Sequence, residues 1–245
     1  MKKIAVLTAL LFAALQIGYA QKVGLVLSGG GAKGAAHIGV IKALEENGIP
    51  IDYITGTSAG AIVGSLYAMG YTPEEMVELM LSEEFSYWQT GTVENEYKYY
   101  FKRPDPTPEF GHFSIDMTDS LQVKASFLPQ SLINPIQMNQ AFMALFSQAT
   151  AKAGWNFDNL FVPFRCVASD IYSKKAIIFK NGDLGDAVRA SMTFPFFFQP
   201  IWKDSVPIFD GGIYDNFPVG PMKEAFHPDF IFGSTVAGGN NKPSS

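Results

Sequence analysis

A serine between two glycines, at the junction of two regular segments, constrains this fold more than any other feature of the sequence. Segment 56–60 reads Gly-Thr-Ser-Ala-Gly and lies between a strand-like run, 51–55, and a helix-like run, 61–69. A serine on such a sharp strand-to-helix turn projects its hydroxyl from the edge of a sheet, and the glycines leave room where the backbone is tightest. The segment predicts an α/β fold with Ser58 as a candidate nucleophile.

The rest of the chain alternates between strands and helices around one irregular region. A strand at 23–27, a Gly-rich loop and a helix precede the 51–55 strand, and this order makes the two strands parallel neighbours. Residues 83–154 read as an aromatic, irregular insertion with one helix near 135–149. Regular structure resumes in strands at 162–169, 175–180, 206–209 and 230–234, with helices near 183–191 and 218–225.

The first twenty residues have the pattern of a secretory signal peptide. Lys2 and Lys3 precede an apolar run at 4–17, and the small residues Gly18 and Ala20 suit cleavage before Gln21. The apolar run is shorter than the ~20 residues that a membrane-spanning helix requires. We therefore expect an exported protein, located in the periplasm, in the outer membrane or outside the cell.

Length and composition support one domain after this leader, residues 1–20. A chain of 245 residues that is 47% hydrophobic can bury a substantial core. We expect the domain to cover 21–237 and the polar residues 238–245 to form a flexible tail or the start of a linker. Cys166 is the single cysteine, so it cannot form an internal disulfide and is expected to be buried as a small hydrophobic residue.

Charge and ligand chemistry exclude several classes of partner. The chain has 18 basic and 23 acidic residues, a net charge of −5, which becomes −7 when the two leader lysines are removed. An acidic chain of this kind is not expected to bind nucleic acid. Histidine and cysteine are scarce and no ligand spacing is present, so the sequence implies no metal and no other cofactor.

The loop after the first strand contains six residues of interest: Gly29, Gly30, Gly31, Ala32, Lys33 and Gly34. Their N–H groups lie at the start of a helix, where negative charge is favoured. A dinucleotide site would need an acidic residue at the end of the second strand, but Asp52 lies at its beginning, and no Gly-Lys-Ser/Thr is present for a Walker loop. We interpret the loop as an oxyanion site, which the parallel strands would bring beside Ser58.

A nucleophilic serine needs a base, and the three histidines are poorly placed. His37 lies one turn into the first helix and is expected to pack beside the Gly-rich loop. His112 lies in the irregular insertion, and His227 follows a helix and precedes a proline. Asp210 follows a strand directly and precedes two glycines. It is the better candidate, although an ordinary Asp-Gly turn has the same sequence.

Three motifs in this order resemble the patatin-like phospholipases: Gly-Gly-Gly-Ala-Lys-Gly at 29–34, Gly-Thr-Ser-Ala-Gly at 56–60 and Asp-Gly-Gly at 210–212. The resemblance covers roughly 22–233, and segment 186–191 also matches it. It implies a three-layer α/β/α sheet, mostly parallel, with a helical or irregular insertion. It further implies a Ser-Asp dyad of Ser58 and Asp210, with the 29–34 loop as the oxyanion site. The other residues that it marks are the elbow glycines, Gly56 and Gly60, and the turn glycines, Gly211 and Gly212.

The resemblance implies a lipid or phospholipid ester as the substrate, hydrolysed without a cofactor. The aromatic run 194–202 fits the wall of an acyl-chain pocket or a peripheral membrane contact, but also an ordinary core strand. The apolar face of the insertion helix is more typical of core: Met138, Phe142, Met143, Leu145 and Phe146. Two other functions stay open: an exported module of a larger outer-membrane or surface protein with weak or no activity, and a small-substrate esterase or thioesterase. Head group, positional specificity and oligomeric state are not indicated.

Overall fold

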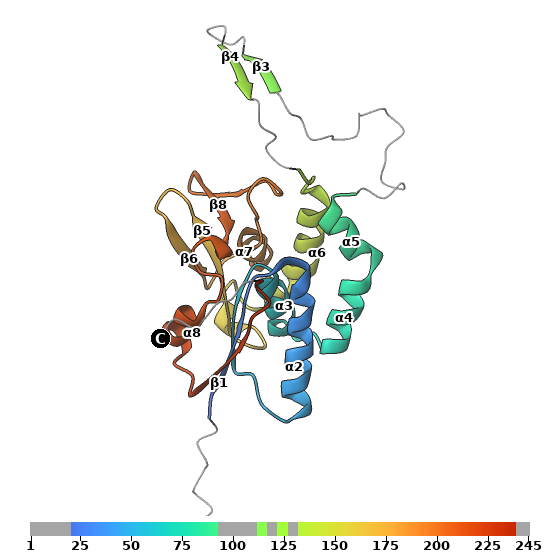
Figure 1. Cartoon of the computed structure of the whole chain (residues 1–245), viewed down its shortest axis with the longest axis vertical. Helices are drawn as coiled ribbons and strands as arrows, with labels where there is room; N and C mark the ends of the chain where they lie inside the picture. Colours follow the sequence, from blue (N-terminus) through green and yellow to red (C-terminus); the bar gives the residue numbers. More distant parts are fainter. Residues whose placement is uncertain (1–20, 93–111, 117–121, 127–131, 239–245) are drawn as a thin grey trace, which may run out of the picture.

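The computed structural model describes residues 21–92, 112–116, 122–126 and 132–238 (Figure 1). The predicted leader, 1–20, and the predicted tail after its first residue lie outside these ranges. A seven-stranded sheet has the order β7-β8-β5-β2-β1-β9, with β6 also paired to β5. Its strands are β1 (Val23–Leu27), β2 (Tyr53–Thr57), β5 (Phe164–Asp170), β6 (Lys175–Phe179), β7 (Ile201–Lys203), β8 (Val206–Asp210) and β9 (Phe230–Ser234).

Parallel pairing dominates the centre of the sheet, as predicted. Strands β9, β1, β2 and β5 are parallel to their neighbours, whereas β6 and β8 join β5 antiparallel and β7 joins β8 antiparallel. Strand β5 extends three residues beyond the end of β2, because Thr57 pairs with Val167 while β5 continues to Asp170. Strand β8 pairs with this overhang. Along the edge of β5 that faces β2, pairing is therefore parallel up to Val167 and antiparallel from Ala168 onward.

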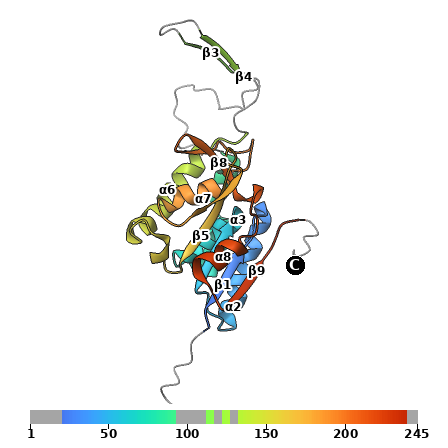
Figure 2. The ribbon, with the colours of Figure 1, turned by 90° about the vertical axis from the view of Figure 1, so that its left-hand side faces the viewer.

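Helices cover both faces of the sheet, which confirms the three-layer α/β/α prediction. Figures 1 and 2 show α2, α3 and α7 on one face and α8 on the other. The helices are α2 (Ala36–Glu46), α3 (Ala59–Ala68), α4 (Pro73–Leu81), α5 (Glu83–Thr90), α6 (Ile136–Lys152), α7 (Leu184–Ser191) and α8 (Val219–Phe226), with short 3-10 turns at η1 (Gly31–Ala35), η3 (Phe157–Asn159) and η4 (Gly211–Ile213).

The predicted boundaries need correction at several places. The strand predicted at 51–55 begins at Tyr53, because the Asp52 carboxylate accepts hydrogen bonds from the Lys22 ammonium and the Val23 N–H and so ends the preceding loop. The predicted insertion, 83–154, contains the regular helix α5 and a hairpin of β3 (His112–Asp116) and β4 (Gln122–Ser126). The rest of the segment between α5 and α6 lies outside the described ranges, apart from residues 91–92 after α5 and 132–135 before α6.

The main core lies between the sheet and the helices of its α3 face. Leu25, Ile54, Leu66 and Phe164 are fully buried there. Cys166 is also fully buried, as predicted. On α6, the predicted core residues Met138, Phe142 and Phe146 are buried and Leu145 is half-buried, but Met143 is 67% exposed because it lies on the opposite side of the helix. None of the helices in the described ranges has the length and hydropathy needed to cross a bilayer.

Candidate active site

Ser58 occupies a strained turn between β2 and α3. Its φ and ψ angles are 54° and −119°, a conformation that a residue with a Cβ atom adopts only when its surroundings enforce it. The turn is tightly packed: a Cβ atom at Gly56 would overlap the Gly60 carbonyl, and one at Gly60 would overlap the Leu27 carbonyl. The glycines at these two positions are therefore required by the close approach of β1, β2 and α3.

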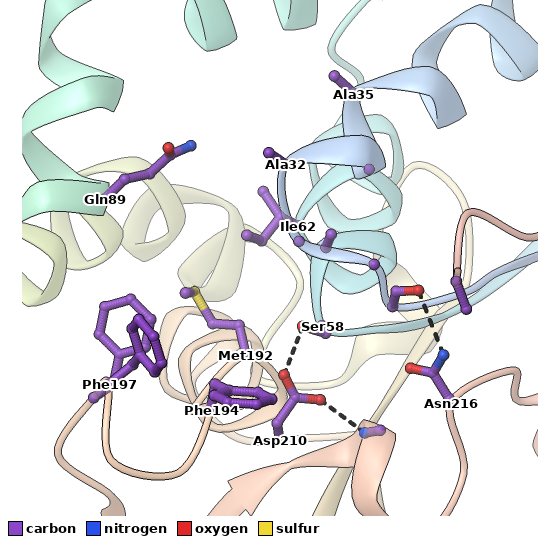
Figure 3. Close-up of a pocket in the computed structure, with 18 of the residues that line it drawn as sticks. Ala32, Ala35, Ser58, Ile62, Gln89, Met192, Phe194, Phe197, Asp210 and Asn216 are labelled. Atoms are coloured by element: carbon purple, nitrogen blue, oxygen red, sulfur yellow. Dashed lines mark hydrogen bonds between the residues drawn. The ribbon is translucent and has the colours of Figure 1, made fainter. Parts of the chain in front are cut away.

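The Ser58 side chain is paired with Asp210 (Figure 3). The Ser58 hydroxyl donates a 2.6 Å hydrogen bond to Oδ2 of Asp210, and the Gly212 N–H donates a 2.7 Å hydrogen bond to Oδ1. Asp210 is only 6% exposed. Burial raises the pKa of Asp210, and the hydrogen bonds from Ser58 and Gly212 oppose that rise. The carboxylate is thus held in one orientation and is a stronger base than an exposed aspartate.

The overhang of β5 explains how Asp210 reaches Ser58. Ala168, the first residue of β5 beyond the end of β2, pairs with Asp210 at the end of β8. Because β8 runs antiparallel to β5, its C-terminal residue comes back to the level where β2 ends and Ser58 begins the turn. Gly211 follows directly and has no room for a side chain, since a Cβ atom there would overlap the Val167 carbonyl.

The Gly-rich loop lies beside the nucleophile. A Cβ atom at Gly29 would lie 3.1 Å from the Ser58 Cβ, and one at Gly34 would overlap the Ala59 Cβ. The N–H of Gly29 donates to the Asn216 carbonyl at 3.1 Å, whereas the N–H groups of Gly30 and Gly31 have no acceptor among the described residues. The loop's candidate oxyanion donors therefore narrow to Gly30, Gly31 and the residues that follow in η1.

Of the six predicted loop residues, one has its N–H bonded to another part of the chain and another lies outside the cavity lining. Gly29 is already engaged with Asn216, as its carbonyl also accepts a 3.4 Å hydrogen bond from the Asn216 amide. Lys33 is exposed and is absent from the residues that line the cavity beside Ser58, whereas Ala32 and Gly34 line it. Asn216 was not identified from the sequence, although it lies only four residues after the Asp-Gly-Gly motif.

No described histidine side chain contacts Ser58. His37 is fully buried, and its Nε2 donates to the Ser28 carbonyl at 2.9 Å, because a carbonyl can only accept. Its Nδ1 then accepts from the Ser234 hydroxyl at 2.7 Å, and burial lowers the pKa of the ring. His227 is exposed at the end of α8, and His112 belongs to β3, where only the backbone is described. No group of three or more potential ligand side chains in the described ranges could hold a metal ion.

An apolar cavity of about 870 Å³ opens beside Ser58 and Asp210. Its size lies in the range of small-molecule and lipid-chain sites. Figure 3 shows that Ile62 of α3 and the aromatic side chains after α7 border the same space. The apolar lining includes Met80, Trp88, Phe142, Met192, Phe194 and Phe197. The aromatic run 194–202 is therefore not a core strand over its first half: Phe194 is 56% exposed and forms a cavity wall.

Comparisons with known proteins agree with the fold and give the family. Residues 25–223 match the family model for patatin-like phospholipases, and the chain belongs to that family. It is 31% identical over 217 residues to lysophospholipase NTE1 of Pyricularia oryzae, covering 88% of this chain and 12% of that protein. It is 29% identical over 203 residues to the patatin-like phospholipase domain-containing protein ZK370.4 of Caenorhabditis elegans, covering 82% and 12%.

This chain thus spans about 12% of the length of the curated relatives it matches. Among solved structures, VipD from Legionella pneumophila matches with a TM-score of 0.54 and 16% sequence identity, over 87% of this chain and 49% of that one. At 16% sequence identity, this match shows a shared fold and nothing about activity.

Proposed function

We propose that this domain is a lipid acyl hydrolase that acts through a dyad of Ser58 and Asp210. The observation that carries the proposal is the 2.6 Å hydrogen bond from the Ser58 hydroxyl to the buried Asp210 carboxylate, at the wall of an apolar cavity. A nucleophile and a base in hydrogen-bond contact, beside unpaired N–H groups, are the parts that acyl transfer requires.

In the first half of the reaction, Ser58 Oγ attacks the ester carbonyl carbon and its proton passes to Asp210 Oδ2. The carbonyl oxygen becomes an oxyanion, which the N–H groups of Gly30 and Gly31 stabilise. When the tetrahedral intermediate collapses, the alcohol leaves with the proton from Asp210 and an acyl-serine ester remains. In the second half, Asp210 takes a proton from water as the hydroxide attacks the acyl carbon. The second tetrahedral intermediate then collapses, Asp210 returns the proton to Ser58 Oγ, and the free fatty acid leaves.

The cavity supports a long acyl chain as the bound part of the substrate. Aromatic and thioether side chains dominate its lining near Ser58 and offer no charged partner for a polar acyl group. A hydrocarbon chain gains by leaving water for such a surface, at about 0.8 kcal/mol per buried methylene. The names of the relatives, lysophospholipase and phospholipase, support phospholipids or lysophospholipids as the ester class.

The mouth of the cavity supports contact with the surface of a lipid aggregate. Phe194 and Phe196 are both exposed on the loop after α7. The backbone of this loop is hydrogen-bonded to the segment before α6, where the Leu132 N–H donates to the Phe196 carbonyl and Leu132 is itself exposed. Phe194 lines the cavity, and Phe196 and Leu132 lie on the two hydrogen-bonded segments next to it, where a hydrocarbon chain would pass from a membrane or micelle. The signal-peptide pattern at 1–20 supports export, so that the lipid would be met outside the cytoplasm.

A second function is supported by the coverage of the relatives, since this chain matches only 12% of the length of its curated relatives. In that case the domain is a module of a larger exported protein and has weak activity by itself. A small-substrate esterase would instead use the same dyad without filling the cavity. The three functions differ in whether an ester is hydrolysed and in which ester it is, and one assay separates them.

The test compares purified protein on three substrates: lysophosphatidylcholine micelles, phosphatidylcholine vesicles and nitrophenyl butyrate. A lipid hydrolase releases fatty acid from the micelles or vesicles faster than it cleaves the butyrate ester, and Ser58→Ala and Asp210→Asn each lower the rate by about a thousandfold. His227→Gln serves as the control and retains full activity, because His227 is exposed and remote. Hydrolysis of butyrate alone would favour the small-substrate esterase, and no hydrolysis at all would favour the inactive module.

A further inference from the structure

Helix α7 ends in a segment that the proposed mechanism leaves unused. Residues 186–191 read Asp-Ala-Val-Arg-Ala-Ser, and α7 packs against β5, α3 and α6, between the nucleophile and the aromatic loop. We propose that its last turn positions both halves of the active site, with Ser191 holding the nucleophile and Arg189 holding the wall of the acyl cavity. The inference rests on the proposed hydrolase function and assigns positioning roles that none of the three sequence motifs covers.

Ser191 joins the nucleophile to the strand that places its base. The Ser191 hydroxyl is fully buried, accepts a 2.9 Å hydrogen bond from the Ser58 N–H, and donates a 2.6 Å hydrogen bond to the Val167 carbonyl. Val167 precedes Ala168, the residue that pairs with Asp210. One hydroxyl therefore links the backbone of Ser58 to the part of β5 that carries Asp210.

The strained conformation of Ser58 gives this link its importance. A residue at φ 54° returns to a relaxed conformation unless its surroundings oppose the change, and the Ser58 N–H is one of the groups that hold it. Removal of the Ser191 hydroxyl leaves the Ser58 N–H and the Val167 carbonyl without a side-chain partner inside the protein. A displacement of about 1 Å at a reacting atom can slow a reaction about a hundredfold. Loss of the Ser191 hydroxyl is therefore expected to slow the chemical step rather than to weaken binding of the acyl chain.

Arg189 holds the aromatic loop from the other side of the same helix turn. It is 3% exposed, and burial lowers its pKa to about 10. Its three donor groups reach the Thr193 hydroxyl at 2.7 Å, the Gln199 carbonyl at 3.1 Å and the Asn139 side-chain oxygen at 3.1 Å. The guanidinium also lies over the Phe198 ring, 5.2 Å from its centre.

These contacts make Arg189 a clamp on the cavity wall. Thr193 and Gln199 bracket the loop that carries Phe194 and Phe197, and Asn139 belongs to α6, which forms another part of the lining. No described carboxylate forms an ion pair with Arg189. A planar guanidinium can satisfy three separate acceptors in one plane, which an ammonium group cannot do. The three hydrogen bonds therefore offset the cost of burying the guanidinium and also hold the loop in place.

The two residues should have different kinetic signatures. Ser191 acts on the reacting atoms, so Ser191→Ala is expected to lower kcat about tenfold to a hundredfold and to change KM less than about twofold. Arg189 acts on the cavity wall, so Arg189→Lys is expected to lower kcat/KM about tenfold for a dodecanoate ester but less than about threefold for a butyrate ester.

Matched controls separate positioning from simple stability. Ser65→Ala also deletes the hydroxyl of a fully buried serine that donates to a carbonyl, that of Ile62. Arg165→Lys also alters a buried arginine, one that pairs with Asp158 and lies over the Phe226 ring away from the cavity. Both controls are expected to lower the thermal midpoint without changing kcat or the chain-length preference.

The experiment measures thermal midpoints, nitrophenyl ester kinetics at two chain lengths, and the rate of labelling by a fluorophosphonate probe. Ser191→Ala should slow labelling by the same factor as kcat, and Ser191→Cys, which keeps a weaker hydrogen-bonding group, should lose less. If Arg189→Lys does not fold, Thr193→Val removes one of the acceptors of Arg189 and should shift the chain-length preference in the same direction. A Ser191→Ala protein with a lower midpoint but wild-type kcat and labelling would overturn the role of Ser191.

The role of Arg189 would be overturned if Arg189→Lys lowered kcat/KM equally for the dodecanoate and butyrate esters and Arg165→Lys behaved in the same way. Failure of the proposed function has a different signature. In that case the wild-type protein neither hydrolyses the esters nor reacts with the fluorophosphonate, whereas the positioning roles fail only when an active wild type is unaffected by these changes.

Discussion

Ser58 and Asp210 are 152 residues apart in the sequence, and their side chains share a 2.6 Å hydrogen bond. The contact brings together the turn after β2 and the end of β8, two strands that do not pair with each other but both pair with β5. Strand β5 thus positions both the strand that leads to the nucleophile and the strand that carries the base. Burial makes the ionised form of Asp210 costly and thereby favours proton transfer to it, so the same effect determines both the pH dependence of activity and the stability of the fold.

The activity should have an acid limit set by Asp210. Burial raises the pKa of its carboxyl above the ordinary value, and only the ionised form can accept the Ser58 proton. We expect kcat/KM on a soluble ester to fall as the pH drops through a midpoint above the ~3.9 of a free aspartate. A profile of kcat/KM against pH measures this midpoint. The same midpoint is expected in a protein that carries both His37→Gln and His227→Gln, and a midpoint that moves in this variant would assign the limit to a histidine.

Replacement of Asp210 by asparagine should stabilise the fold at neutral pH. The pKa of Asp210 is raised in the folded state, so the folded protein binds more protons, and the cost of the ionised carboxyl is fully present above that raised pKa. An asparagine side chain at this position would carry no charge at any pH. We expect Asp210→Asn to raise the thermal midpoint at pH 7, and the gain to shrink as the pH falls through the raised pKa. A midpoint at pH 7 below that of the wild type would contradict this account of the dyad.

The local parts of this site could be predicted from the sequence, but their assembly could not. The turn at Ser58 and the Gly-rich loop are each encoded within a few residues, because glycine spacing and the flanking hydrophobic runs determine them. Placing Asp210 beside Ser58 depends on the three-residue overhang of β5 and on the antiparallel direction of β8, which are properties of pairing rather than of either segment. The same limit applies to Arg189 and Ser191, whose partners lie in other elements.

Short or polar elements were the hardest to predict. Strand β7 has three residues, and α5 has no fully buried residue, so neither produces a clear hydrophobic period. The aromatic run 194–202 could be read as core because its composition is that of a core strand. Aromatic side chains of this run are exposed because Arg189 holds the loop and because a cavity lies behind it. Neither feature can be predicted from the sequence of this segment alone.

His37 should make stability fall in mildly acid solution without serving as the base. Burial lowers its pKa below 6.5, so the unfolded chain protonates first, and stability is lost as the pH falls from about 6.5 towards the lower folded value. We expect the urea midpoint of the wild type to drop between about pH 7 and pH 5.5, and the drop to be smaller in His37→Gln. His227→Gln is the control variant at an exposed histidine. Hydrolysis by His37→Gln should persist within about tenfold, whereas loss comparable to that of Ser58→Ala would make His37 part of the chemistry.

The proposed membrane contact should depend on Phe196 rather than on exposed aromatic surface in general. Phe196 is 67% exposed on the loop whose Phe194 and Phe197 line the cavity, and Phe161 is 74% exposed next to Gly70, at the opposite end of α3 from Ser58. Phe196→Asp should lower vesicle binding and vesicle hydrolysis by about fivefold or more, because a charge cannot enter the apolar part of a bilayer cheaply. Cleavage of a soluble butyrate ester should stay unchanged. Phe161→Asp should leave all three measurements at wild-type values, and a loss equal to that of Phe196→Asp would rule out the mouth as the contact.

The depth of the cavity should set the length of the acyl chain. Ile62 lies one helical turn after Ser58, borders the cavity, and is anchored by a 3.1 Å hydrogen bond from its N–H to the Ser58 carbonyl. Ile62→Trp fills the space beside the nucleophile while leaving the dyad in place. We expect kcat/KM for a dodecanoate ester to fall about tenfold or more and that for a butyrate ester to change less than about threefold, since only the longer chain must pass this position. Ile62→Ala is the opposite change and should keep or extend the preference for long chains. If Ile62→Trp lowers both rates equally, the acyl chain does not lie along α3, and the wall formed by Phe194 and Phe197 is then the surface that holds it.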